Sequence, residues 1–202
     1  MGILSEPFRT TVEYHDRLYQ TRPAFNVVLA VQRLYRDGFL TDREKCLLAL
    51  RNLVRLSRFT LASRPLSWCY GLMDEVYRSQ IALPERHTGA RQERVLDFEL
   101  DGEYIYASFL QDYGMDLIRE QGRLHWKKFI WLFQGLSEGT KIKEVMRIRG
   151  MEEPNPNKYN QKEIQRIREL KSYYALPAVG SGGQEGLNRL FSMLEAQAVR
   201  NG

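Results

Sequence analysis

Cysteine is scarce in this chain: Cys46 and Cys69 are the only two among 202 residues, and both lie in apolar stretches with helical spacing. A count this low excludes the dense disulfide framework of small secreted proteins. We interpret both as buried thiols in a reducing compartment rather than as a disulfide or a redox pair. A chain of this length can bury about 70% of its unfolded surface, so a hydrophobic core can stabilise it without cross-links.

Long apolar runs are also missing, because no window approaches the ~18 uninterrupted apolar residues of a membrane span. The N-terminal sequence MGILSEPFRTT lacks a basic region followed by an apolar one, and Glu6 stands where N-myristoylation requires Ser or Thr. We therefore expect a protein of the cytoplasm, with no signal peptide and no membrane partner.

Histidines are few, and no recognisable catalytic motif is present. His15, His87 and His125 show neither HExxH nor a Cys/His ligand spacing. His125 lies at a helix start beside an aromatic face, which favours a packed or capping side chain over a metal ligand. GxSxG, P-loop and GxGxxG patterns are absent, and the GSGG segment has no buried strand before it.

Acidic residues are concentrated in one short stretch, which contains Asp97, Glu99, Asp101 and Glu103. Their simplest interpretation is the N-terminus of a helix, where the helix dipole favours negative charge. A metal site is the less favoured alternative. Together with the missing motifs, this predicts a protein that is not an enzyme and has no catalytic residue, metal or cofactor.

What the sequence does contain is helical periodicity after a short alternating segment. Residues 11–21 alternate around His15-Asp16, which predicts an N-terminal β-hairpin. From Pro23 the apolar spacing is helical, and Thr41 with Glu44 matches a capping box. Further helices are predicted at about residues 66–80, 101–114, 125–135, 137–150 and 160–174. The expected fold is mainly α, a bundle-like helical domain over residues 1–178 with a small hairpin.

Two polar interruptions and a terminal segment complete the predicted organisation. Residues 84–94 are charged and carry Pro and Gly, so we expect a surface loop. Residues 179–183 read as a flexible linker, and residues 184–202 as a tethered amphipathic helix. Its apolar stripe is Leu187, Leu190, Phe191 and Leu194. Such a short helix is marginal alone in water, so it either docks on its own core or enters a groove of a partner.

An aromatic helix at HWKKFIWLFQGL raises the question of a surface tryptophan. Its apolar side chains share one broad face, whereas Trp131 falls on the opposite side with Lys127 and Lys128, and only Leu124 is apolar there. A second helix of the same domain, a lysine over the ring, or a partner can cover it. The candidate partner-binding residues are Trp131, Lys127, Lys128, Leu124, Leu187, Leu190, Phe191 and Leu194.

Several strings resemble one family. These are YIYASFLQDYGMDL, LHWKKFIWLFQGLSEGTKIKEVMRIRGM and RIRELKSYYALP, which are similar to the bacteriophage gene product fifteen proteins of siphophages and prophages. The likeness runs from about Thr10 to Pro177. It departs at His15-Asp16, where that family tends to have Asn-Gly, and it is weakest in the loop and in the tail after Gly180.

The resemblance implies a phage tail assembly factor in the host cytoplasm. Proteins of this family are similar to tail assembly chaperones, which would keep the tape measure protein soluble while tail tube subunits gather on it. A second tail assembly chaperone is a further partner that the resemblance suggests. It supplies no catalytic residue.

A nucleic-acid-binding helical protein is the competing class, since the net charge is +5 and the pI about 9.2. One basic group is Arg43, Lys45, Arg51, Arg55, Arg58 and Arg64. Acidic residues interleave with it, and neither helix-turn-helix spacing nor an aromatic stacking platform stands out. A structural tail or connector component of the virion is a third alternative.

Overall fold

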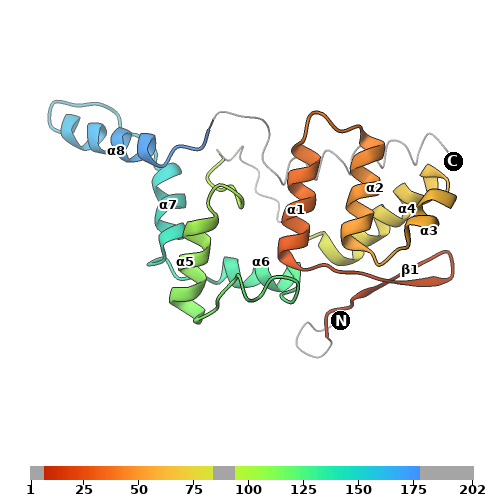
Figure 1. The fold of residues 1–202 in the computed structure, drawn as a ribbon. Helices are drawn as coiled ribbons and strands as arrows, with labels where there is room; N and C mark the ends of the chain where they lie inside the picture. Colours follow the sequence, from red (N-terminus) through yellow and green to blue (C-terminus); the bar gives the residue numbers. More distant parts are fainter. Residues whose placement is uncertain (1–6, 84–93, 178–202) are drawn as a thin grey trace. The chain divides into compact units, whose positions relative to one another are not determined.

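The computed structural model describes residues 7–83 and 94–177, and these are mainly helical with one two-stranded sheet (Figure 1). This confirms the predicted fold class. Where the sequence predicts one helical domain over residues 1–178, the described chain forms two compact units. The first unit comprises residues 7–83 and 120–131, and the second unit comprises residues 94–119 and 132–177.

The N-terminal hairpin is present as predicted. Strand β1 (Thr11–Tyr14) pairs with β2 (Arg17–Gln20) in antiparallel fashion. The two turn residues, His15 and Asp16, have φ angles of 49° and 56°. A two-residue turn with positive φ at both positions matches the twist of the strands, and Asp and His tolerate this region better than most residues. His15-Asp16 therefore replaces the usual Asn-Gly without losing the hairpin.

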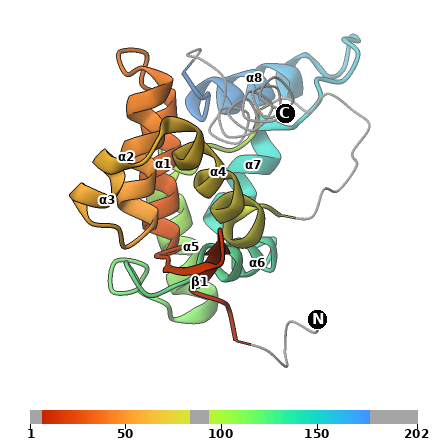
Figure 2. The same ribbon diagram turned by 90° about the vertical axis from the view of Figure 1, so that its right-hand side faces the viewer.

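The helices of the first unit pack around an apolar core. They are α1 (Phe25–Arg36), α2 (Asp42–Leu53), α3 (Arg58–Ser63) and α4 (Leu66–Val76), followed by a π-helical turn η1 (Tyr77–Ile81). Figures 1 and 2 both show α1 and α2 side by side, and α4 contacts α2 and β1. Val28, Leu50 and Leu72 are fully buried in this core. α3 lies in a stretch where the sequence analysis predicts no helix.

The capping box at the start of α2 is confirmed. The backbone N–H of Glu44 donates to Thr41 Oγ1 at 3.3 Å, and the backbone N–H of Thr41 donates to Glu44 Oε2 at 2.9 Å. The Thr41 hydroxyl also donates to Glu44 Oε2 at 2.7 Å. This hydrogen bond, together with the one from the Thr41 backbone N–H, lowers the pKa of Glu44. The carboxylate of Glu44 thus serves to cap the N-terminus of α2.

Helix α6 (Trp126–Gln134) begins against α1. Phe25 N donates to Leu124 O at 2.9 Å, and Trp126 N donates to Pro23 O at 2.7 Å. The buried ring of Phe129 stacks on Phe25 with centroids 4.8 Å apart. Residues of α6 through Trp131 belong to the first unit, and those from Leu132 to the second.

The second unit contains α5 (Gly102–Tyr113), α7 (Lys141–Arg149) and α8 (Gln161–Tyr173), with α7 packed against both other helices. Helix α5 ends at Gly114, whose φ of 60° is the left-handed cap that glycine adopts without strain. Ser108 in α5 accepts the backbone N–H of Ile142 at 3.0 Å, which fixes α5 against the first turn of α7.

A buried ion pair holds the second unit together. Arg149 at the end of α7 donates from both terminal nitrogens to Asp101, at 2.7 and 2.8 Å. The same guanidinium donates to the backbone carbonyls of Val95, at 3.0 Å, and Tyr174, at 2.6 Å. Asp101 also accepts the backbone N–H of Asp97 at 2.8 Å. One charged pair therefore joins the segment before α5 to the ends of α7 and α8.

Candidate partner-binding site

Trp131 lies on the face of α6 opposite Phe129, as the helical spacing predicts. Its side chain is half-buried rather than fully exposed. The ring of Phe8, in the segment before β1, lies over it with centroids 5.4 Å apart and planes inclined by 37°. An aromatic side chain from the N-terminal segment thus covers part of Trp131, and this cover differs from the three that the sequence suggests.

Phe8 also stacks on His125, with centroids 4.4 Å apart and planes inclined by 22°. His125 precedes the first residue of α6, and its Nδ1 accepts the backbone N–H of Lys127 at 3.1 Å. Its Nε2 lies 3.4 Å from Gln80 Oε1, so the neutral ring carries its proton on Nε2. The prediction of a packed or capping histidine is confirmed, because His125 is both.

The surroundings of His125 keep it uncharged. Burial, with a smaller contribution from the charge of Lys127, lowers its pKa to about 4. A proton on Nδ1 would also remove the acceptor that caps α6. We define the Phe8–Trp131 cluster as Phe8, His125 and Trp131, in which Phe8 stacks on the neutral capping ring of His125 and makes a tilted contact with Trp131.

The two lysines beside Trp131 differ from each other. Lys127 Nζ donates to the carbonyl of Ser79 in η1 at 2.9 Å, and burial lowers the pKa of this lysine. The side chain of Lys128 is exposed. Within the described part of the chain, neither ammonium group lies over the Trp131 ring. Lys128 thus remains available to a partner, while Lys127 is occupied by η1.

Leu124 does not share this surface. The sequence places it beside Trp131 on the polar face, whereas the structure leaves it only 4% exposed, with its carbonyl bonded to Phe25. It precedes α6, so helical spacing did not apply to it. The other predicted contact residues, Leu187, Leu190, Phe191 and Leu194, lie outside the described residues, as do the linker 179–183, the segment 184–202 and the loop up to residue 93.

Other exposed apolar side chains occur in the first unit, at positions that are not among the predicted contact residues. Phe39, between α1 and α2, is 98% exposed, and Phe59, on α3, is 87% exposed. Neither belongs to an apolar stripe of a long helix, so helical spacing does not reveal them in the sequence.

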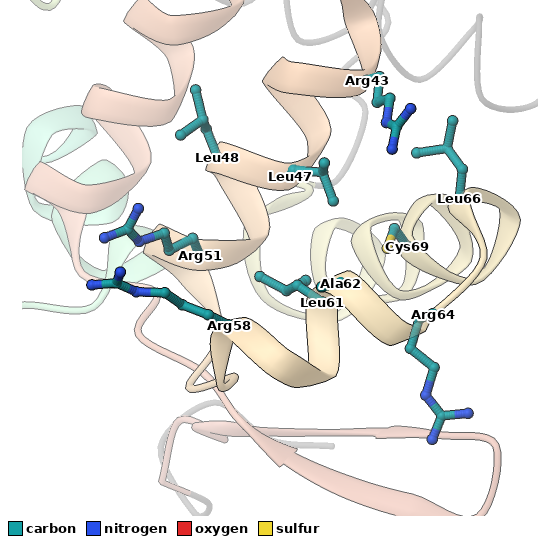
Figure 3. Close-up of a pocket in the computed structure, with 10 residues that line it drawn as sticks. All are labelled: Arg43, Leu47, Leu48, Arg51, Arg58, Leu61, Ala62, Arg64, Leu66 and Cys69. Atoms are coloured by element: carbon teal, nitrogen blue, oxygen red, sulfur yellow. The ribbon is translucent and has the colours of Figure 1, made fainter.

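A pocket of about 470 Å³ lies between α2, α3 and α4, and Figure 3 shows the side chains that line it. We call it the arginine pocket. Its lining residues are Arg43, Leu47, Leu48, Arg51, Arg58, Leu61, Ala62, Arg64, Leu66 and Cys69. These arginines form part of a basic group that is visible in the sequence, but the pocket is not visible there, because the sequence does not predict α3.

The acidic stretch at residues 97–103 has structural partners. Asp97 Oδ1 accepts the backbone N–H groups of Glu99 and Leu100, and Asp97 is also paired with Arg94. Asp101 pairs with Arg149. Among residues 7–83 and 94–177, no three His, Cys, Asp or Glu side chains are grouped so as to hold a metal ion. Every helix in the same ranges is too short or too polar to cross a bilayer.

The comparison with protein families decides the identity of the chain. The model of the family described as bacteriophage Gp15 protein matches residues 4–176. The chain belongs to the bacteriophage Gp15 family. The Gp15 match covers all the elements described above and both compact units, and it confirms the resemblance seen in the sequence. Neither curated proteins nor solved structures gave a match.

Proposed function

We propose that this Gp15 protein is a non-enzymatic tail assembly chaperone. It acts in the host cytoplasm and binds apolar helical segments of the tape measure protein, tail tube subunits, or both, and a second chaperone can join it. Its membership of a phage family supports a role in phage development. The observation that carries the proposal is the position of Trp131. This large apolar side chain lies on the face of α6 opposite Phe129 and is only half-buried.

The cover over Trp131 suits reversible binding. Phe8 contributes one tilted aromatic contact to it, and such a pair is worth about 0.5–1.5 kcal/mol beyond the area that it buries. A client helix with an aromatic or leucine side chain can replace Phe8 at small net cost. The contact of Trp131 with Phe8 is then exchanged for a contact of similar strength with the client. Such an interaction forms while the apolar helix of the client is exposed and ends when the client is assembled into the tail.

Co-expression with the neighbouring tail genes tests the proposal. We expect the tape measure protein to stay soluble and to co-purify with the Gp15 protein, and to precipitate when it is expressed alone. Truncation after Gly180 tests the C-terminal segment: we expect an unchanged melting temperature and weaker client capture. Unchanged capture would assign binding to residues 1–180 alone.

Mass spectrometry of purified phage particles separates a chaperone from a structural part. A chaperone leaves before the tail is complete, so we expect no peptides of this chain in mature particles. A stoichiometric amount would instead identify a structural tail or connector component.

A further inference from the structure

The arginine pocket has an apolar floor and a cationic rim. The floor consists of Leu47, Leu48, Leu61, Ala62, Leu66 and Cys69. The rim consists of Arg43 and Arg51 from α2, Arg58 from α3 and Arg64 just after α3. In Figure 3, the guanidinium groups of Arg51 and Arg58 point the same way at one end, and Arg43 lies toward the other end near Leu66, while the side chain of Arg64 points away from the leucines.

The arginines of the rim form no ion pair within the described part of the chain. No acidic side chain lines the pocket, and none of the four arginines forms an ion pair with a carboxylate of the described residues. Glu44, next to Arg43 in sequence, is committed to its capping box. Arg64 lies over the ring of Trp68, 5.2 Å from its centroid. The like charges of Arg43, Arg51 and Arg58 beside the opening repel one another, and an anionic partner relieves that repulsion.

The apolar side chains of the floor are not fully buried. Helix α3 has no buried residue, and Leu47, Leu61 and Leu66 are only half-buried. A leucine left half-exposed forgoes part of the ~1.5–3 kcal/mol that full burial provides. The volume of about 470 Å³ falls in the usual range of ligand pockets, about 300–1,000 Å³, and has room for several aliphatic side chains. An inorganic anion alone would leave these apolar side chains exposed to water.

We propose that the arginine pocket docks an acidic amphipathic helix of a partner protein. Two or three leucine-like side chains at helical spacing fill the floor, and flanking Asp or Glu carboxylates pair with the guanidinium groups at the two ends. The planar guanidinium matches a carboxylate through two parallel hydrogen bonds. Nucleic acid fits less well, because an aliphatic floor offers no ring on which bases stack. This site uses other residues than the Phe8–Trp131 cluster and goes beyond the proposed chaperone role.

Binding of a synthetic peptide to the full chain tests the inference. The probe is a fluorescent helix of about 20 residues with leucines at helical spacing and glutamates elsewhere, and the matched control peptide carries lysine in place of glutamate. We expect anisotropy titrations to show the acidic peptide binding at least about tenfold more tightly. The charge-reversed double variant Arg51→Glu/Arg58→Glu should lose about tenfold or more of that affinity.

A matched double variant controls for net charge. Arg147→Glu/Arg166→Glu changes two exposed arginines of the second unit by the same charge, and we expect affinity for the acidic peptide to change by less than about twofold at 0.15 M salt. Ala62→Trp fills the floor from an exposed position without changing charge. It should also abolish binding, which keeps the test decisive if the double reversal at Arg51 and Arg58 fails to fold.

Several outcomes would overturn the inference. Equal affinity for the acidic and basic peptides, or no loss in either pocket variant, would remove the arginine pocket as the site. Binding of duplex DNA, without peptide binding, that is lost in Arg51→Glu/Arg58→Glu would make it a nucleic-acid site. Self-association of the wild-type chain in sedimentation that is lost in the same variant would make a second copy the occupant.

Discussion

In the first unit, the fully buried side chains at the centre of α1, α2 and α4 are apolar, with Val28, Leu50 and Leu72 among them. In the second unit, the buried charged pair Asp101–Arg149 ties three segments together at one point. An apolar core loses stability in proportion to the volume removed, whereas a buried ion pair fails when either partner is lost. The second unit has buried apolar side chains too, such as Phe109 and Ile142, so its charged pair is a weak point in addition to an apolar core.

Removal of Asp101 should have the largest effect. Asp101→Ala leaves the Arg149 guanidinium buried without its carboxylate, and we expect a loss of about 3–5 kcal/mol in the free energy of unfolding. Urea denaturation followed by circular dichroism measures it. Arg168→Met is the matched control, because it breaks the exposed Arg168–Glu153 pair and should change stability little. Equal effects from both would show that burial of the pair is unimportant.

A cavity in the first unit should have the next largest effect. Leu72→Ala removes a fully buried side chain from α4, and we expect a loss of about 2–4 kcal/mol. Hydrogen exchange read by mass spectrometry should show the loss of protection in α2 and α4, which pack together. Leu18→Ala, at a 73% exposed leucine of β2, is the control and should leave protection unchanged. A comparable loss from both leucines would contradict the apolar core.

Acidification should weaken the first unit by a smaller amount. The pKa of His125 falls from its ordinary value of 6.5 to about 4 on folding, so between these values the unfolded chain holds more protons. Stability therefore decreases as pH falls through this window, by about 1–2 kcal/mol after allowance for partial exposure. His125→Gln should flatten this dependence in melts between pH 7 and 4. The same slope in both proteins would assign it to other groups.

The sequence predicted the elements whose signals are local. Thr41 and Glu44 are three residues apart, and Gly114 directly follows its helix, so a short window contains all the information. Helix α3 has a local signal too, since Ser57 Oγ accepts the backbone N–H of Thr60 at 3.0 Å. Its six residues, none of them buried, are too few to show the apolar periodicity of a helix.

What could not be predicted depends on contacts between distant segments. Arg149 is 48 residues from Asp101 in sequence, and only the packing of α5 against α7 brings the two together. Phe8 is an isolated apolar residue with no periodic neighbours, so nothing in the sequence directs it to Trp131. The candidate site was thus half predicted: the tryptophan from helical spacing, its cover only from the structure.

Truncation of Trp131 should have the smallest effect on stability and a large effect on function. Its side chain is half-buried, so Trp131→Ala should cost about 1 kcal/mol in stability. Phe39→Ala is the matched control, since it removes an aromatic side chain that is 98% exposed in the same unit.

Quantified co-purification of the tape measure protein with wild type, Trp131→Ala and Phe39→Ala tests the chaperone proposal most directly. We predict that recovery of the tape measure protein falls severalfold for Trp131→Ala and stays at the wild-type level for Phe39→Ala, with all three proteins folded. Wild-type recovery by folded Trp131→Ala would contradict the role assigned to this face of α6.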